Sequence, residues 1–176
     1  MPHIKTERLT LYIGAYHRKF RPDIHIEWLN NKELMKYSEQ RHRRHTLESQ
    51  RKYLASFDHA ASFLWEIYIT DHLLPIGTIT AFCDWRNKVA DLGILIGEFR
   101  GKGYGSEAWT AICEWLFKKG YRKIEAGCMA SNAAMIKIFG KTGMVIEGRR
   151  RSHFLLDGKP EDLILAARFE LAIASK

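Results

Sequence analysis

RGKGYGS, residues 100–106, is the stretch of sequence that decides the fold. It follows an apolar run at 90–96 and opens an amphipathic helical pattern that ends near Gly120. Glycines let backbone N–H groups curl toward a ligand without Cβ clashes. The first turn of a helix adds unpaired N–H groups and the positive end of its dipole. The stretch therefore predicts an anion site suited to a pyrophosphate, with charge added by Arg100 and Lys102.

Two common phosphate-binding loops do not fit this stretch. The P-loop needs Ser or Thr directly after its Gly-Lys pair, and here Gly103 follows Lys102. The dinucleotide fingerprint GxGxxG needs a third glycine where Ser106 stands. That fingerprint also usually lies in the first strand–helix–strand unit, whereas four expected strands precede this loop. A phosphate loop of another class and a tight turn without a ligand are the readings that remain.

The rest of the chain alternates between strand and helix patterns. Strands are predicted at 7–13, 63–69, 75–84, 90–96, 123–130, 145–156 and 162–171. Helices are predicted in 22–36 as one or two short segments, at 47–57 after Thr46, from about 103 to 120, and at 132–143 after Asn132. The Asp157–Gly158 pair predicts the turn of a closing hairpin. This order predicts one mixed α/β domain over residues 1–176, with helices packed on a sheet.

Composition narrows the class of protein further. The chain has 176 residues, 46% of them hydrophobic and 27% charged, which suits one globular domain. Without an apolar run of about 18 residues or a signal-peptide pattern, we expect no membrane partner and a cytoplasmic location. The three cysteines, Cys83, Cys113 and Cys128, are widely spaced in apolar contexts. We therefore expect free thiols, no disulfide framework and no metal site.

The net charge of +8 favours anionic partners. Nucleic acid, a phosphate-rich cofactor and a nucleotide-linked substrate all fit that charge. A non-catalytic nucleic-acid-binding module would place stacking aromatics beside basic residues on an open face. The aromatic residues here mostly follow the core patterns of strands and helices, so we expect no nucleic-acid partner. A homodimer formed through strand edges is left open.

Several motifs in the correct order resemble the GNAT family of N-acetyltransferases. Arg100-x-x-Gly103-x-Gly105 resembles the family's Q/R-x-x-G-x-G/A signature, and residues 91–96 resemble its central strand. Residues 132–144 resemble the second motif, an asparagine followed at fixed spacing by a glycine–apolar pair. ERLTL near the N-terminus and the closing DGKPEDLIL are similar to the branch of ribosomal-protein, polyamine and amino-sugar acetyltransferases. The resemblance covers essentially the whole chain.

This resemblance implies a mostly antiparallel sheet with helices on both faces, splayed at its central strand to hold acetyl-coenzyme A. The pantetheine would pair with the backbone of Ile94, Leu95 and Ile96. The pyrophosphate would lie on the loop and first helical turn, which comprise Arg100, Gly101, Lys102, Gly103, Tyr104, Gly105 and Ser106. Asn132 and Phe139 of the second motif would lie against the cofactor. Simple helix capping is an alternative, or an additional, role for Asn132.

Acetyl transfer to an amine needs a base, a near-attack geometry and a donor for the oxyanion. We expect direct transfer without an acyl-enzyme, because no cysteine has an evident activating context. Many family members place a proton-donating tyrosine seven residues after the asparagine, where Phe139 stands here. Another branch places a serine three residues after it, where Met135 stands. Tyr104 or a water would replace these acids, or the thiolate would leave unaided.

Three residues are candidates for moving the proton of the amine. We favour Asp91 as the base and expect it at the mouth end of the central strand. Glu66 would serve instead if its strand turned that side chain toward the cleft. His153, near the closing hairpin, is a candidate acceptor contact and proton relay. The alternative for each is a surface or structural role.

The acceptor side is expected in the early helices and the loop SEQRHRRH at 38–45. The residues assigned to it there are Glu39, Arg41, His42 and Arg43. Arginines grip phosphates, so this loop favours a small-molecule amine that is phosphorylated or nucleotide-linked, such as an amino sugar on a nucleoside diphosphate. It disfavours polycations such as spermidine. A protein N-terminus, a small amine or amino acid, and a fold that binds coenzyme A without turnover are the alternatives.

Overall fold

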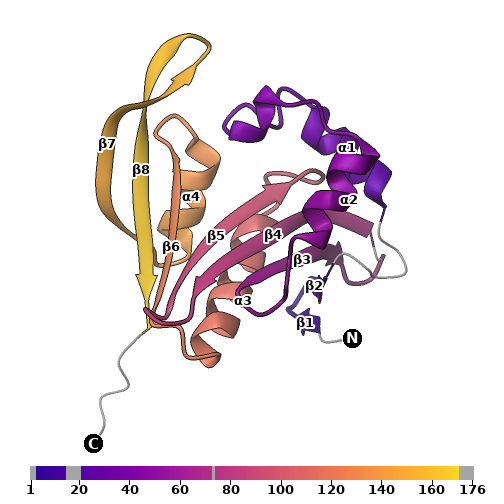
Figure 1. Cartoon of the computed structure of the whole chain (residues 1–176). Coiled ribbons are helices and arrows are strands. Elements are labelled where there is room, and N and C mark those ends of the chain that lie inside the picture. Colours follow the sequence, from indigo (N-terminus) through magenta and orange to yellow (C-terminus); the bar gives the residue numbers. More distant parts are fainter. Residues whose placement is uncertain (1–2, 15–20, 73, 171–176) are drawn as a thin grey trace, which may run out of the picture.

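The computed structural model of the protein describes residues 3–14, 21–72 and 74–170 (Figure 1). Within these residues the strands are β1 (His3–Lys5), β2 (Leu9–Ile13), β3 (Ser62–Ile69), β4 (Leu74–Asp84), β5 (Val89–Ile96), β6 (Lys123–Met129), β7 (Val145–Leu156) and β8 (Lys159–Phe169). The helices are α1 (Pro22–Asn30), the 3-10 helix η1 (Glu39–His42), α2 (Leu47–Ala55), α3 (Tyr104–Lys118) and α4 (Ala133–Lys141). The strands form one sheet in the order β1-β2-β3-β4-β5-β6-β8-β7.

The sheet is antiparallel at every described pair except β5 and β6, which run parallel. Their pairing covers Val89–Asp91 on β5 and Lys123–Glu125 on β6, and then stops. Both strands continue beyond that point, to Ile96 and Met129. The two strands therefore diverge into a V, which confirms the splayed, mostly antiparallel sheet that the family resemblance implied.

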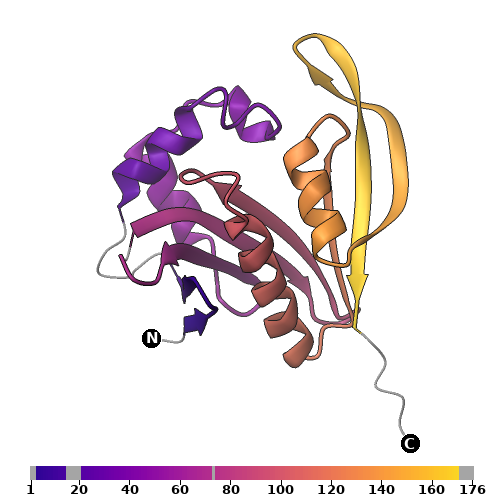
Figure 2. The same ribbon diagram turned by 180° about the vertical axis from the view of Figure 1, so that it is seen from behind.

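Helices cover both faces of this sheet, as Figures 1 and 2 show from opposite sides. Side chains alternate along β3, so its neighbours identify the faces. The rings of Phe63 and Trp65 lie 5.3 and 5.2 Å from Trp115 of α3. Leu64, which points the opposite way, packs in a buried cluster with Leu54 and Phe57 at the end of α2. The α3 face and the α2 face thus each have their own apolar packing.

Close packing of α3 on α4 supports one side of the V. Trp109 is fully buried, and its ring meets Phe139 edge-on at 6.2 Å. Its indole N–H donates to the sulfur of Met144 at 3.1 Å. Gly105 permits the close approach of α3 to α4, because a Cβ at this position would stand only 3.1 Å from the Cδ1 atom of Ile138. The glycine at position 105 therefore serves helix packing as well as the loop.

Two regions differ from the sequence-based expectation. The predicted helical segment 22–36 ends at Asn30, because the Asn30 side chain pairs with the backbone of His45 through two hydrogen bonds of 2.9 Å. The chain then turns into η1. Strand β1 was not expected, since its three residues are too few to show a period. The end of the predicted strand 162–171 falls partly outside the described residues.

Local capping and turn chemistry agree with the sequence. The Thr46 hydroxyl accepts from the Ser49 N–H and forms a capping box at the start of α2. The Asp157–Gly158 turn has positive φ at both residues, 50° and 77°, as a tight hairpin turn requires. None of the described helices is long and apolar enough to cross a membrane.

Candidate active site

A cleft of about 510 Å³ occupies the V, between β5, the start of α3 and the start of α4. It contains most of the residues predicted to bind the cofactor. These are Ile94, Leu95, Ile96, Arg100, Gly101, Gly103, Tyr104, Gly105, Ser106 and Asn132. The segment before η1 closes the cleft opposite the loop, with Met35, Tyr37 and Ser38 among its lining residues. The structure thus brings the glycine loop at 100–106 and the second motif, which begins at Asn132, together around one cavity.

The edge of β5 supplies backbone groups to this cleft. Beyond Asp91 the strand has lost its β6 partner while its β4 pairing continues to Ile96. Backbone N–H and C=O groups on the β6 side of Leu92–Ile96 are therefore free to pair with an extended ligand. A pantetheine arm carries two amide groups and can add to such an edge as a strand does. The predicted contact at Ile94–Ile96 falls on this unpaired edge and stays a prediction.

The start of α3 has the backbone geometry that an anion site needs. Gly101 and Gly103 have positive φ of 80° and 87°, which L-residues with a Cβ rarely adopt. The first turn bond runs from the Glu107 N–H to the Gly103 carbonyl at 3.2 Å. The N–H groups of the residues between them have no partner within the helix and point out of its positive end. This arrangement fits a pyrophosphate.

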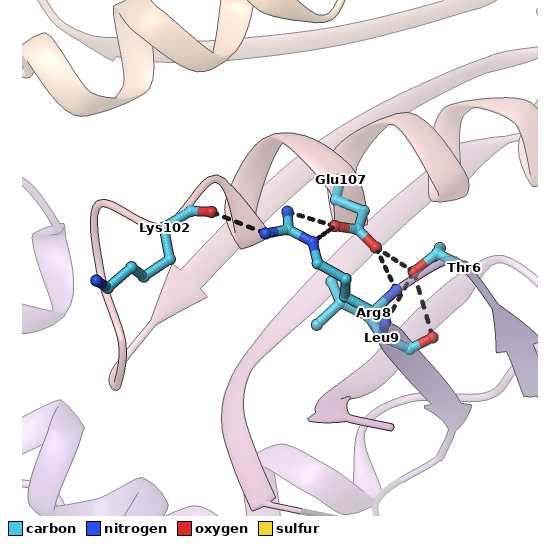
Figure 3. A network of polar contacts seen from close by, with 5 residues as sticks. All are labelled: Thr6, Arg8, Leu9, Lys102 and Glu107. Atoms are coloured by element: carbon cyan, nitrogen blue, oxygen red, sulfur yellow. Dashed lines mark hydrogen bonds and ion pairs between the residues drawn. The ribbon is translucent and has the colours of Figure 1, made fainter. Parts of the chain in front are cut away.

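Arg8 holds the anion loop in place through a network that the sequence did not reveal (Figure 3). Its guanidinium donates to the Lys102 carbonyl at 3.1 Å and to the Glu107 carboxylate at 2.7 Å. It also lies 4.6 Å from the centre of the Tyr104 ring. Glu107 accepts a further 2.6 Å bond from the Thr6 hydroxyl. Arg8, the residue before β2, therefore contacts the Lys102 carbonyl, the Tyr104 ring and the Glu107 carboxylate, which lie on both sides of Gly103.

We expect Arg8→Ala to weaken coenzyme A binding about tenfold, an effect of about 1.4 kcal/mol. The loss follows because the loop must then be ordered by the ligand itself. Calorimetric titration with coenzyme A measures the change. Arg122→Ala is the matched control, since that guanidinium also donates to a backbone carbonyl, of Asn87 at 3.0 Å, away from the cleft. Equal dissociation constants for the two variants would contradict the role of Arg8.

Two predicted cofactor contacts lie elsewhere. Phe139 is buried in the core against Trp109 and is not among the residues that line the cleft. The orientation of α4 explains this. With Met135 and Ile138 directed into the cleft, the Phe139 side chain is directed into the core. Lys102 is also absent from the lining, and its carbonyl faces Arg8. Asn132 caps α4 by accepting from the Met135 N–H at 3.1 Å, so its amide NH₂ is the group left for a ligand.

A second cavity, of about 320 Å³, lies on the α1/α2 side of the sheet. It meets the first at Ile94 and Leu95, and Met35 and Ser38 also line both. Its other lining residues are His25, Leu29, Gln40, Arg43, Arg44, His45, Ser49, Gln50, Tyr53, Thr78, Thr80 and Gly93. A ligand in each cavity would therefore meet at the same two residues of β5. That is the arrangement that a donor and an acceptor need.

The position of α1 over this second cavity depends on Gly97. A Cβ on Gly97 would stand 2.2 Å from the ring of Trp28. The Trp28 indole N–H donates to Glu98 at 3.1 Å. The absence of a side chain at position 97 thus lets α1 rest directly on the end of β5. This contact joins the acceptor wall to the cofactor strand.

The second cavity is basic. Arg43, Arg44 and His45 line it, and none of the lining residues that the structure describes carries a carboxylate. His25 is buried, and its Nδ1 lies 2.6 Å from the Gln50 amide nitrogen. Burial, together with the charge of His45, lowers the pKa of His25 to about 4, so its ring is neutral near pH 7. The cavity therefore suits an anion more than a polycation.

Of the residues predicted to bind the acceptor, Arg43 lines this cavity. Glu39, Arg41, His42 and His153 do not. The Arg41 guanidinium donates to the Leu155 carbonyl of β7 at 3.0 Å and forms an ion pair with Glu39 at 2.7 Å. It thus ties η1 to the closing hairpin. His42 and His153 are exposed, and the sequence pattern offered no way to separate these side chains from Arg43.

Asp91 lies at the closed end of the V, which corrects its predicted place at the mouth. It is the last residue of β5 that still pairs with β6, opposite Glu125. The parallel pairing begins at the starts of both strands, and for this reason the V opens toward Ile96. The residue is exposed, but surrounding protein partly desolvates its carboxylate. This desolvation, with a smaller contribution from Glu125, raises the pKa of Asp91 to about 6.

Glu66 is a buried acid on β3, on the face of the sheet that α1 and α2 cover. Glu66 is 2% exposed. One of its carboxyl oxygens accepts a hydrogen bond of 2.9 Å from the Tyr68 hydroxyl. The other oxygen has no hydrogen-bond partner among the described residues. Burial raises the pKa of Glu66 to about 8. In the sheet register Glu66 pairs with Thr78, which lines the second cavity, and Thr78 pairs with Leu95.

The cysteines offer no activated nucleophile. All three are free thiols. Burial raises the pKa of Cys113 to about 12 and that of Cys128 to about 11, and it also raises the pKa of Cys83. The described residues contain no group of His, Cys, Asp or Glu that is placed to hold a metal ion.

A splayed strand edge, an anion site at a helix start and a second cavity that opens on the same strand together define an acyltransferase that uses coenzyme A. The family comparison names the class: the model described as an acetyltransferase (GNAT) domain matches residues 11–145. The chain belongs to the GNAT acetyltransferase family, whose members transfer acetyl groups from acetyl-coenzyme A. No curated protein sequence matches it.

Solved structures of similar fold act on different acceptors. A Salmonella typhimurium acetyl transferase that modifies the N-terminal serine of a 50S ribosomal subunit protein is 20% identical, with a TM-score of 0.80 over 97% of this chain and 100% of that one. The microcin C7 self-immunity acetyltransferase, in complex with acetyl-CoA and AMP, is 16% identical, with a TM-score of 0.79 over 94% of each chain. Spermidine N-acetyltransferase from Vibrio cholerae, in complex with CoA and spermine, is 18% identical, with a TM-score of 0.78 over 90% of this chain and 95% of that one. At these identities the likeness establishes the fold.

Proposed function

We propose that the protein transfers an acetyl group to the primary amine of a small anionic molecule that is phosphorylated or nucleotide-linked, such as an amino sugar on a nucleoside diphosphate. One observation carries this proposal. The cavity that meets the cofactor cleft at Ile94 and Leu95 is lined by Arg43 and Arg44 and by no described carboxylate. Guanidinium groups bind phosphates well and repel polyamines. A fold neighbour crystallised with acetyl-CoA and AMP supports the same acceptor class.

The amine would attack the thioester directly where the two cavities meet. Asp91 is the proposed base. It lies on the same face of β5 as Leu95 at the junction, four residues away, which is about 13 Å along the strand. Because Asp91 does not line the cavity, a chain of several waters would relay the proton. A backbone N–H on the free edge of β5 would donate to the oxyanion.

We propose that the thiolate leaves without help from a side-chain acid. Met135 lines the cleft and carries no acidic proton, while Phe139 lies in the core. Tyr104 lines the cleft beside the anion loop, under Arg8, and so belongs to the pyrophosphate end. A thiol with an unperturbed pKa of about 8.5 is a tolerable leaving group near neutral pH.

An acceptor screen tests the proposal. Thiol release from acetyl-CoA is measured with a phosphorylated amino sugar, a sugar nucleotide bearing a free amine, a peptide with a free N-terminus and spermidine. We expect the phosphorylated amines to give the highest kcat/KM, and Arg43→Gln with Arg44→Gln to raise their KM at least tenfold. The peptide represents the second candidate function, N-terminal acetylation of a protein. A higher kcat/KM for the peptide or for spermidine would overturn the proposed acceptor class.

A further inference from the structure

Exposed aromatic side chains of α2 and β4 border the second cavity. Tyr53 is 39% exposed and Phe82 is 52% exposed, both large values for aromatic residues. Tyr53 itself lines the cavity. Phe82 lies two residues beyond Thr80 on β4, so the two side chains share one face of the sheet, and Thr80 also lines the cavity. The exposed rings are therefore continuous with the cavity.

A buried ring holds these two exposed rings in one group. Phe57, after the end of α2, meets Tyr53 edge-on at 5.0 Å and lies 5.8 Å from Phe82. Phe57 is 6% exposed, and it packs on Leu64 in the buried cluster beneath α2. The exposed rings are thus supported from below. We name Tyr53, Phe57 and Phe82 the aromatic ledge.

The size of the cavity gives the ledge a use. About 320 Å³ is near the lower end of the range for small-molecule sites, which is about 300–1,000 Å³. An amine-bearing group and its phosphate would fill that space beside Arg43 and Arg44. The remainder of a nucleotide-linked acceptor must then lie outside the cavity, and that remainder contains a planar heteroaromatic ring. Such rings stack on aromatic side chains without requiring specific hydrogen bonds.

The sheet register places the ledge within reach of the chemistry. Phe82 pairs with Asp91 on the neighbouring strand, so the ledge borders the proposed base on one side. Arg43 and Arg44 line the same cavity from the segment between η1 and α2. A nucleotide bound across both features would present an attached amine to the strand between them.

We propose that Tyr53 and Phe82 form a subsite that stacks the nucleobase of a nucleotide-linked acceptor. This inference rests on the proposed function, because a phosphate in the basic cavity is what directs the base to the ledge. It adds a specificity element: the protein distinguishes a nucleotide from a bare phosphate by the aromatic ring.

Binding of AMP and UMP to the protein saturated with coenzyme A tests the subsite. Saturation is required because coenzyme A carries its own adenine nucleotide. Ribose 5-phosphate is the probe without a base. We expect each nucleotide to bind at least tenfold more tightly than ribose 5-phosphate, and Phe82→Ala to remove most of that difference. Phe82→Leu retains apolar volume without the π face, so it separates stacking from a loss of packing.

Phe169→Ala is the matched control, since that ring is 45% exposed at the end of β8, away from the cavity. It is expected to leave nucleotide binding unchanged, and all three variants are expected to bind coenzyme A as the natural protein does. Equal affinity for nucleotides and ribose 5-phosphate overturns the subsite while the basic cavity stands. An unchanged nucleotide affinity in both Phe82 variants has the same consequence. Failure of every phosphate probe to bind, with a peptide as the best acceptor in the screen, overturns the proposed function as well.

Discussion

Asp91→Asn is expected to lower kcat by about 10²–10⁴-fold near pH 7.5, the range that one positioned base contributes. The amide keeps the shape of the carboxylate, so binding of coenzyme A should not change. The physical reason is that an ammonium group cannot attack the thioester until it loses a proton. In this site Asp91 is the carboxylate on the cavity face of β5, four residues before Leu95.

The pH dependence of kcat/KM gives the sharper form of this prediction. The pKa of Asp91 is raised to about 6, and a base must be deprotonated to act. The rate of the natural protein should therefore rise with pH through about 6 and then level off until the acceptor amine itself titrates. The Asn variant should lack the lower inflection.

Glu125→Gln supplies a control for the assignment of that inflection to Asp91. Glu125 is the smaller of the two causes that raise the pKa of Asp91, after desolvation. Its removal should move the inflection to lower pH with little change in the plateau rate. A full rate for Asp91→Asn across the pH range would show that another group is the base.

Glu66→Gln is expected to become more stable than the natural protein as pH rises. The folded-state pKa of Glu66 is about 8, above the value of 4.5 expected for an unperturbed glutamate. The folded state therefore retains a proton that the unfolded chain releases. Stability from this group is complete below about pH 4.5, falls as pH rises toward about 8, and is then constant. Each pKa unit is worth about 1.4 kcal/mol, so the loss across this window is roughly 3–5 kcal/mol.

The Gln variant cannot ionise, so its free energy of unfolding should lack this decline. Urea unfolding at pH 5, 6.5 and 8 measures both proteins. Glu48→Gln, on an exposed side chain of α2, controls for the loss of one carboxylate. The prediction fails if the natural protein and Glu66→Gln show the same slope of stability against pH. That result would mean that the buried carboxyl has a partner in solution that stabilises its charged form.

The features predicted correctly from the sequence are those that local chemistry determines. Apolar periodicity identified the strands from 63 to 96 and the long helix α3. Gly101 and Gly103 identified the anion loop, because few other residues adopt their backbone angles. Asn132 and Thr46 were recognised as caps from their chemistry and position. The order of these elements indicated a mixed α/β sheet with packed helices, and the resemblance to the GNAT family implied its splay.

The features missed from the sequence depend on contacts between distant segments. Arg8 and Glu107 are 99 positions apart, and no local pattern links an arginine before β2 to a glutamate in α3. The corrected place of Asp91 depends on which end of β5 pairs with β6, which periodicity does not encode. The same limit applies to the SEQRHRRH loop, where Arg43 and Arg44 line the cavity and Arg41 links η1 to β7.

The central claim is that backbone amides at the β5–α3 junction bind the pyrophosphate of acetyl-coenzyme A. Calorimetric titration of the natural protein with coenzyme A and with pantetheine tests it most directly, because pantetheine keeps the arm but lacks the pyrophosphate. The account predicts one coenzyme A per chain, displaced by acetyl-coenzyme A, and binding of pantetheine at least a hundredfold weaker. No heat with coenzyme A, or equal affinity for pantetheine, would contradict it.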